Sequence, residues 1–227
     1  FGSSHLVQSA VGGKTLQLCD FHLLGQSLLL CAMGSTHSNQ VSIAVFDFDC
    51  TLTQAMVYHD LQDLNGIGHR APPTLDMAQR CTDRWWVSEF GGVERIRMLD
   101  ACLGRLRSMG VKCYVCSFNK SEIIIEALER VGIAHHFRNG EGVMRIIGGS
   151  PGADKGTRVK MIMDKHSVNA ALFVDDTEEN CADVARAIQG IAVVNCSRRG
   201  LTASDFDQIV TYFNIAGAGK KQKASCL

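Results

Sequence analysis

The stretch from Val41 to Thr53 constrains the fold of this 227-residue chain more than any other. It reads V-S-I-A-V-F-D-F-D-C-T-L-T, a short apolar run rich in β-branched residues that leads directly into Asp47 and Asp49. An apolar run of this length predicts a strand that is buried on both faces. In open α/β sheets, ligands bind outside the carboxyl ends of the strands. The pattern therefore predicts two carboxylates at a ligand site, although aspartates can also end a strand as simple turn formers.

The rest of the chain alternates between strand-like and helix-like segments. An amphipathic helix is predicted over 92–110, where Gly110 stops it. Its arginines, Arg95 among them, are expected on a solvated face. Further strands are predicted at 111–116, 143–147, 170–174 and 191–194, and further helices at 122–131, from Lys155 onward, from Asn180 to 188, and at 204–213. This alternation predicts a mainly parallel sheet with right-handed crossovers.

The overall charge gives no reason to expect a polyanionic partner. Lys plus Arg and Asp plus Glu both number 23, so the formal net charge is zero. We therefore expect neither nucleic acid nor a membrane surface as a partner. The apolar patch at 23–33 is shorter than the ~20 residues that span a bilayer, although it could form the core of a signal peptide.

The ten cysteines have no regular spacing and are expected to be free thiols, many of them small core residues. Cys113 and Cys116 form a C-x-x-C, but they lie in a predicted strand, where positions three apart point to opposite faces. The absence of a second such pair leaves too few ligands for a structural zinc site.

Four motifs in order resemble those of the haloacid dehalogenase-like (HAD) hydrolase superfamily. They are D-F-D-C-T at 47–51, C-Y-V-C-S at 113–117, D-K-G-T-R-V at 154–159 and L-F-V-D-D-T-E-E-N at 172–180. The second and third are weak alone, but the ordered set is specific. The resemblance implies an α/β, HAD-like Rossmannoid three-layer sandwich with a mainly parallel central sheet and a short cap insertion.

On this basis the chain divides into an N-terminal extension or leader at 1–40, a HAD-like catalytic domain at 41–216 and a basic C-terminal tail at 217–227. Residues 54–92 correspond to the family's cap, and their shortness suggests an open site suited to a large or protein-borne phosphate. Trp85 and Trp86 either line the entrance or anchor the insertion to the core. His59, Asp60 and His69 are candidate substrate contacts, but the sequence favours a plain surface position for each of them.

The resemblance also assigns roles to individual residues. Asp47 would be the nucleophile and Asp49 the general acid and base. Ser117 and Lys155 would hold the phosphate, with Lys160 as a rival lysine, and Thr51 joins this phosphate-binding group as the residue that orients the loop. The metal would be bound by Asp47, by the backbone carbonyl of Asp49 and by Asp175 as the main carboxylate. Asp176 would assist directly or through water, and Asn180 would support a metal-bound water or have no role.

A cluster of three or four carboxylates requires a cation. Two unit charges 4 Å apart repel by roughly 4 kcal/mol at an effective dielectric constant of 20. Hard oxygen ligands select Mg²⁺, which binds one or two carboxylates together with a substrate phosphate. The sequence therefore predicts a Mg²⁺ cofactor.

The expected function is Mg²⁺-dependent phosphomonoester hydrolysis through an aspartyl-phosphate, acting on a phosphorylated small molecule or a phosphoprotein. Two alternatives stay open: a phosphotransferase or phosphomutase of the same superfamily, and a non-catalytic HAD-fold binding or regulatory protein. A cytoplasmic location is expected, and self-association into a homo-oligomer is left open.

Overall fold

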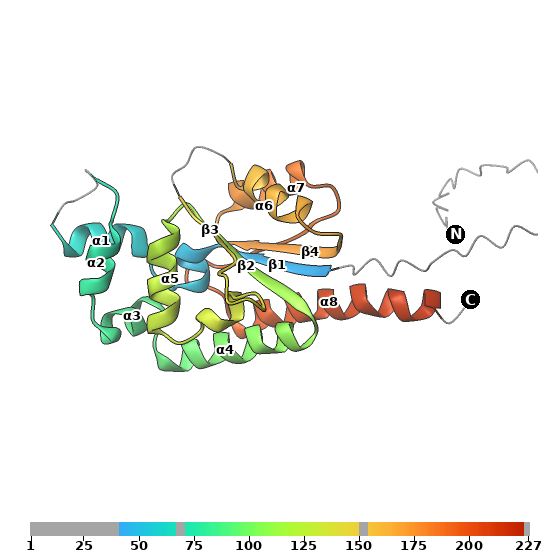
Figure 1. Cartoon of the computed structure of the whole chain (residues 1–227), viewed down its shortest axis with the longest axis horizontal. Helices are drawn as coiled ribbons and strands as arrows, with labels where there is room; N and C mark the ends of the chain where they lie inside the picture. Colours follow the sequence, from blue (N-terminus) through green and yellow to red (C-terminus); the bar gives the residue numbers. More distant parts are fainter. Residues whose placement is uncertain (1–40, 67–70, 150–153, 225–227) are drawn as a thin grey trace, which may run out of the picture. The chain divides into compact units, whose positions relative to one another are not determined.

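The computed structural model describes residues 41–66, 71–149 and 154–224 (Figure 1). The predicted extension at 1–40 and His69 lie outside these ranges. The Val41–Thr53 stretch forms the central strand, β1 (Val41–Phe46), as its buried apolar pattern predicts.

Within the described ranges the sheet has five strands in the order β3-β2-β1-β4-β5, and every neighbouring pair is parallel. The strands beside and beyond β1 are β2 (Val111–Cys116), β3 (Ile146–Ile147), β4 (Val168–Asp175) and β5 (Ala192–Asn195). Phe46, the last residue of β1, lies opposite Val115 of β2 and Val174 of β4. This register brings the ends of three strands level, so the motifs that follow them meet at one edge.

Helices cover both faces of the sheet, which gives three layers (Figure 1). One face packs against α4 (Val93–Ser108), α5 (Ser121–Arg130) and α8 (Ala203–Ala224), in a core that includes Phe46, Leu103 and Phe206. The other face packs against α6 (Lys155–Asp164) and α7 (Glu178–Ala187) through a smaller core around Val45 and Phe173. The prediction of an α/β three-layer sandwich with a parallel sheet is confirmed.

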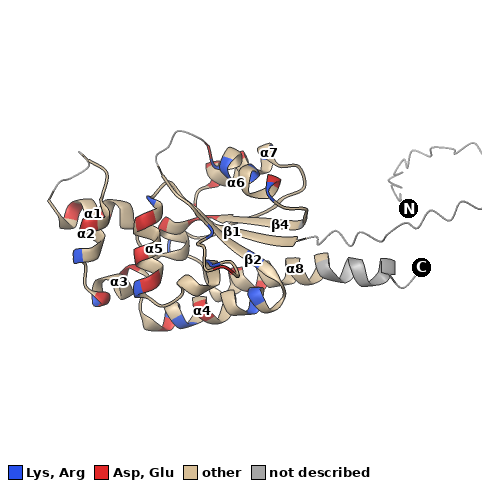
Figure 2. Ribbon diagram, in the orientation of Figure 1, with Lys and Arg blue, Asp and Glu red and all other residues tan. Residues whose placement is uncertain are grey.

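Charged residues are spread over the helices with both signs mixed, while the strands carry few (Figure 2). This arrangement agrees with a net charge of zero and a sheet buried on both faces. Cys113 and Cys116 lie in the two different cores and are free thiols, as their strand positions predict.

The insertion after β1 is helical but consists of three short helices, α1 (Val57–Leu64), α2 (Leu75–Arg80) and α3 (Asp83–Glu89). The sequence pattern suggests one continuous helical stretch from 74 to 90, whereas the structure breaks it at Cys81 and Thr82. The Thr82 side chain accepts a hydrogen bond from the Trp85 N–H and so caps a new helix. Trp86 is fully buried in the core, where it anchors the insertion.

The last helix is longer than predicted. Its apolar face, with Phe206, Ile209 and Phe213, matches the predicted helix at 204–213. The helix continues to Ala224 and so enters the segment expected to be a tail, because no proline interrupts the backbone there. Among the helices of the described ranges, none has both the length and the apolar character needed to cross a membrane.

Candidate active site

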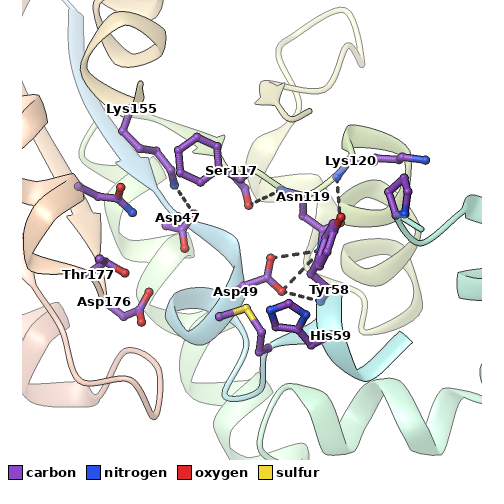
Figure 3. A pocket seen from close by; sticks show the side chains of 14 residues that line it. Asp47, Asp49, Tyr58, His59, Ser117, Asn119, Lys120, Lys155, Asp176 and Thr177 are labelled. Atoms are coloured by element: carbon purple, nitrogen blue, oxygen red, sulfur yellow. Dashed lines mark hydrogen bonds and ion pairs between the residues drawn. The ribbon is translucent and has the colours of Figure 1, made fainter. Parts of the chain in front are cut away.

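The loop after β1 is held in an unusual backbone conformation. It forms a kinked turn, η1 (Phe48–Leu52), in which the backbone of Asp49 and Cys50 is not helical and Cys50 has a φ of 55°, a left-handed conformation rare for a residue with a side chain. The Thr53 hydroxyl accepts a hydrogen bond from the Cys50 N–H at 3.2 Å. It also donates to the Phe48 carbonyl oxygen at 3.0 Å. This turn places Asp47 and Asp49 on either side of one cavity (Figure 3).

Arg95 fixes the same turn from helix α4. Its guanidinium donates to the carbonyl oxygens of Leu52 at 2.7 Å, Phe90 at 2.9 Å and Thr51 at 3.0 Å. The expectation that Arg95 lies on a solvated face is therefore wrong, because its guanidinium is held by these backbone carbonyl oxygens. Burial lowers the pKa of Arg95 to about 10.

Lys155 occupies the centre of the charged cluster. The first residue of α6, it is 1 % exposed, and its ammonium donates to Asp47 Oδ1, to Asp175 Oδ2 at 3.2 Å and to the Cys116 carbonyl at 2.8 Å. Burial lowers the pKa of Lys155, but the charges of Asp47 and Asp175 outweigh burial, and the pKa is raised overall. Lys155 is therefore a permanent cation between two strand ends.

Asp47 is almost fully buried, with 6 % of its surface exposed. Burial raises its pKa, the Lys155 ammonium lowers it, and the charge of Asp175 raises it again; the result is a pKa of about 7. One lysine therefore does not fully compensate the carboxylates that meet here. An additional cation would favour the ionised form of Asp47.

Asp175 and Asp176 at the end of β4 differ in their surroundings. Asp175 is fully buried and accepts hydrogen bonds from Lys155, from the Thr177 N–H at 2.9 Å and from Asn180 Nδ2 at 3.0 Å. Asp176 lines the cavity, and burial raises its pKa. One carboxylate oxygen each from Asp47, Asp175 and Asp176 lies within 4.8 Å of the others, a set that could hold a metal ion.

Asp49 faces the same cavity from the other side (Figure 3). Its Oδ1 accepts the Tyr58 N–H of helix α1 at 3.1 Å, and its Oδ2 accepts Asn119 Nδ2 at 3.1 Å. Burial raises the pKa of Asp49, the two hydrogen bonds lower it, and the result is about 6. A carboxyl with such a pKa can both give and take a proton near neutral pH.

The loop after β2 completes the pocket. Ser117 is buried, lines the cavity and accepts the Asn119 N–H on its hydroxyl at 3.1 Å. Arg158, one turn after Lys155, donates to the Ser117 carbonyl at 2.9 Å and lies over the Phe118 ring. The loop is thus held between α6 and the sheet, with the Ser117 hydroxyl facing Asp47 across the pocket (Figure 3).

The cavity has a volume of about 340 Å³, and residues of the insertion line part of it. Its outer wall is more apolar than its acidic base and includes Met56, Tyr58, Pro72 and Phe118. His59 also lines it, whereas Asp60, Trp85 and Trp86 do not. Both tryptophans instead pack on the core, Trp86 fully buried and Trp85 partly, so the anchoring alternative describes their position.

Most of the predicted site residues lie together, and one does not. Asp47, Asp49, Ser117, Lys155 and Asp176 line one cavity, with Asp175 directly behind it. Thr51 is fully buried outside the cavity, and its hydroxyl lies 3.7 Å from Cys196 Sγ. The rival Lys160 is exposed and pairs with Asp164 at 3.1 Å.

Three residues with clear roles in the geometry were not predicted as site residues. Asn119 lies in the loop between β2 and α5, and its side chain donates to Asp49. Arg158 follows Lys155 by three residues, a spacing that places both on one helix face and could have revealed it. Tyr58 contributes a backbone N–H, for which no sequence signal exists.

Comparison with protein-family models and with curated proteins finds no match. Among solved structures, the HAD domain of the effector protein Lem4 from Legionella pneumophila matches with a TM-score of 0.54 and 19% identity, over 78% of this chain and 97% of that one. A second structure of that domain, an inactive mutant, has the same TM-score and identity and covers 80% and 98%. The Legionella pneumophila effector Ceg4 matches with a TM-score of 0.52 and 16% identity, over 78% and 97%.

These likenesses define the fold as that of a HAD domain, as the four motifs predict. At such low identity the comparison establishes the fold alone, so the chemistry of the site must be argued from this chain's own residues.

Proposed function

We propose that this protein is a Mg²⁺-dependent phosphomonoester hydrolase that acts through an aspartyl-phosphate on Asp47. The observation that carries the proposal is the placement of Asp47 between a buried lysine and two further carboxylates, with Asp49 facing it across one cavity. This set provides a nucleophile, a cation for phosphate oxygens, and a separate acid and base.

The donor chemistry of the site fits Mg²⁺. The candidate ligand atoms of Asp47 and Asp176 are carboxylate oxygens, the hard ligands that Mg²⁺ prefers. Burial raises the pKa values of Asp47 and Asp176 even though Lys155 contacts Asp47 and Arg198 lies 3.9 Å from Asp176, so a further cation would favour both ionised forms. Bound Mg²⁺ would supply charge neutralisation between the carboxylates and a phosphate dianion.

The hydrogen bonds of Asp175 and Asp176 indicate which of the two would face a metal ion. Asp175 already accepts from Lys155, Asn180 and the Thr177 N–H, whereas Asp176 faces the cavity. We therefore assign Asp176 as the metal-facing carboxylate and Asp175 as the residue that positions Lys155, with Asn180 holding Asp175. The Asp49 backbone carbonyl stays the proposed contribution of that residue to the metal.

The reaction needs two displacements at phosphorus. In the first, an Asp47 oxygen forms a bond to phosphorus while the ester P–O bond breaks, and Asp49 gives its proton to the departing alcohol oxygen. In the second, Asp49 takes a proton from water as the water oxygen attacks phosphorus, and the bond to Asp47 breaks. Inorganic phosphate leaves and both carboxyls return to their starting states.

Lys155 and Ser117 would bind the oxygens of the transferring group. The ammonium of Lys155 touches the Asp47 oxygen, so it lies close to the position of the incoming phosphorus. A fixed charge there stabilises the negative charge that spreads over the phosphoryl oxygens. Thr51, which is buried away from the cavity, would act only by holding the loop.

The test is hydrolysis of a generic aryl phosphate with Mg²⁺, with EDTA and in Asp47→Asn. We expect turnover that needs the metal and falls by at least about a thousandfold in the variant, because no nucleophile remains. Asp164→Asn, which changes an exposed aspartate on α6, is the matched control and should keep full activity. Metal-dependent turnover that survives in Asp47→Asn would overturn the assignment.

Product analysis separates hydrolysis from phosphoryl transfer. With an added sugar or alcohol acceptor, a hydrolase releases one inorganic phosphate for each ester consumed. A deficit of phosphate matched by a phosphorylated acceptor would instead identify a phosphotransferase that uses the same aspartate.

A further inference from the structure

A second group of metal-ligand side chains lies away from the candidate active site, between helix α4 and the 3₁₀-helix η3 (Ala134–Phe137). Asp100 belongs to α4, and His135 and His136 belong to η3. Each offers one ligand atom, and the three atoms lie within 4.8 Å of one another. None of these residues lines the cavity that contains Asp47.

The hydrogen bond of His135 fixes which of its nitrogens is available. Its Nδ1 lies 3.0 Å from the Gly132 carbonyl oxygen, which can only accept, so Nδ1 carries the proton. In the neutral ring, Nε2 then holds a lone pair, and this atom lies 3.6 Å from Asp100 Oδ1. His135 Nε2 and Asp100 Oδ1 both carry lone pairs and repel each other at that distance. A metal ion or a proton between them would turn this repulsion into attraction.

His136 supplies the second nitrogen. It is 3 % exposed, and its Nε2 lies 2.7 Å from the same Asp100 oxygen. Its ring packs against that of His135, with centroids 3.9 Å apart and the ring planes tilted by 42°. The two Nε2 atoms are thereby held near one carboxylate oxygen.

We infer that Asp100, His135 and His136 form a binding site for a divalent transition-metal ion such as Zn²⁺. Two imidazoles and one carboxylate suit Zn²⁺, Ni²⁺ or Cu²⁺, whereas Mg²⁺ prefers oxygen ligands alone. Tetrahedral zinc with bonds of about 2.1 Å places its ligand atoms about 3.4 Å apart. The observed separations of 2.7 and 3.6 Å from Asp100 Oδ1 lie on either side of that value.

The position of the site also suits an exchangeable ion. The side chains of Asp100 and His135 are 52% and 55% exposed, which gives an ion an entry path and leaves room for water as a fourth ligand. A bound ion would tie η3 to α4 across two segments distant in sequence.

One feature limits the affinity. Binding through Nε2 of His136 moves its proton to Nδ1, a buried atom with no hydrogen-bond partner within the described ranges. An unsatisfied buried donor costs roughly 1–3 kcal/mol, so we expect moderate rather than picomolar binding.

The test is calorimetric titration of the full chain with ZnCl₂ at about pH 7.5, where an ordinary histidine is mostly neutral. Saturating Mg²⁺ is present to occupy all-oxygen sites. Wild type should bind one more zinc ion per chain than His135→Ala, or bind that ion at least about tenfold more tightly. Removing a residue that supports a metal ligand already lowers metal affinity about tenfold or more, and removing the ligand itself should lower it at least as much. Asp100→Asn should show the same loss.

His166→Ala is the matched control, because it removes a histidine that contacts Tyr114 and takes no part in the group. It should bind zinc as wild type does. Thermal unfolding without zinc checks that His135→Ala, a change at an exposed side chain, still folds. Equal zinc binding by wild type and His135→Ala, or no saturable binding by wild type at millimolar zinc, would refute the site.

Discussion

At the scale of single residues, Lys155 is a buried cation that pairs with two buried carboxylates. Its charge therefore balances part of theirs. A buried ion pair contributes little net stability over an apolar replacement of the whole group, but removing one partner strands the other charges. The lysine is therefore needed for folding as well as for the proposed chemistry.

Lys155→Met keeps most of the length of the side chain and removes its charge. We expect the metal-free variant to lose about 3–5 kcal/mol of unfolding free energy at neutral pH, since Asp47 and Asp175 are left without their cation. Urea unfolding in EDTA measures the loss. Lys160→Met, on the exposed face of the same helix, should change stability by less than about 1 kcal/mol. Equal effects of the two changes would contradict the role of Lys155.

Asp49 makes the stability of the metal-free protein depend on pH. Its folded-state pKa of about 6 exceeds the ordinary value of 3.8, so the folded state binds the proton more tightly than the unfolded state does. Its contribution to stability is therefore full below pH 3.8 and is lost as pH rises through about 6.

Asp49→Asn removes this dependence. As pH rises from about 4 to about 8, the unfolding free energy of the variant should increase by roughly 2–3 kcal/mol relative to that of the metal-free wild type. The reason is that one pKa unit corresponds to about 1.4 kcal/mol. Denaturant unfolding in EDTA at both pH values gives the difference, and subtracting wild type cancels the titration of Asp47. A difference that stays constant with pH would show that Asp49 has an ordinary pKa.

At the scale of elements, helices α6 and α7 approach closely at Gly156, the residue after Lys155. A Cβ at this position would lie 2.6 Å from the Ala187 Cβ and 3.0 Å from the Asp183 carbonyl oxygen. The Gly156 N–H donates to Asp183 Oδ2 at 2.9 Å. The absence of a side chain here allows α6 to sit where Lys155 reaches Asp47.

Gly156→Ala sets two effects against each other. Alanine favours a helix over glycine by about 1 kcal/mol, but overpacking costs about 1–3 kcal/mol. We expect overpacking to win, because a backbone oxygen and a Cβ cannot rotate away, and both stability and phosphatase activity should fall. Gly140→Ala, where a Cβ would have no neighbour within 4 Å, is the control. If Gly156→Ala were stabilised and fully active, helix α7 would have to shift at little cost to make room for the added Cβ.

Among the described helices of the insertion, α1 alone contributes to the cavity wall, while Met56 and Pro72 line it from outside the helices. Helix α1 supplies the Tyr58 N–H to Asp49 and the His59 side chain to the cavity wall. Helices α2 and α3 contribute no residue to the wall within the described ranges, and Trp86 fixes α3 to the core. The insertion therefore acts as one side of an open pocket.

At the scale of the whole molecule, the site joins three strand ends from distant parts of the chain. Asp47, Ser117 and Asp176 follow the ends of β1, β2 and β4, and they are adjacent only because these three strands are neighbours in the sheet. An ion bound here would link these segments and favour the folded state over the unfolded chain, where no such group exists.

Mg²⁺ should therefore stabilise the entire domain. At a concentration a hundred times its dissociation constant, one bound ion adds about 2.7 kcal/mol. Thermal unfolding with Mg²⁺ and with EDTA should show a higher Tm with the metal, and Asp176→Asn should remove most of the shift. Asp164→Asn, an exposed aspartate that faces no carboxylate cluster, should retain it. An undiminished shift in Asp176→Asn would place the metal elsewhere.

Local sequence determined the elements and the chemical character of the site. The apolar runs before Asp47 and Ser117 matched β1 and β2 in full, because short buried strands need little information beyond their own residues. The alternation of strands and helices predicted the parallel sheet, and the ordered motifs predicted which side chains gather at its carboxyl edge. These features depend on neighbours in sequence.

Tertiary structure alone decided what depends on contacts between distant segments. Arg95 and Thr51 are 44 positions apart, and nothing local shows that one binds the other's carbonyl oxygen. Nothing local shows that Asn119 donates a hydrogen bond to Asp49 either. Nor does the local sequence show that Asp175 accepts hydrogen bonds from neighbouring side chains while Asp176 faces the cavity. Periodicity shows which residues share a face, but the partners that a face meets are set by how the helices pack on the sheet.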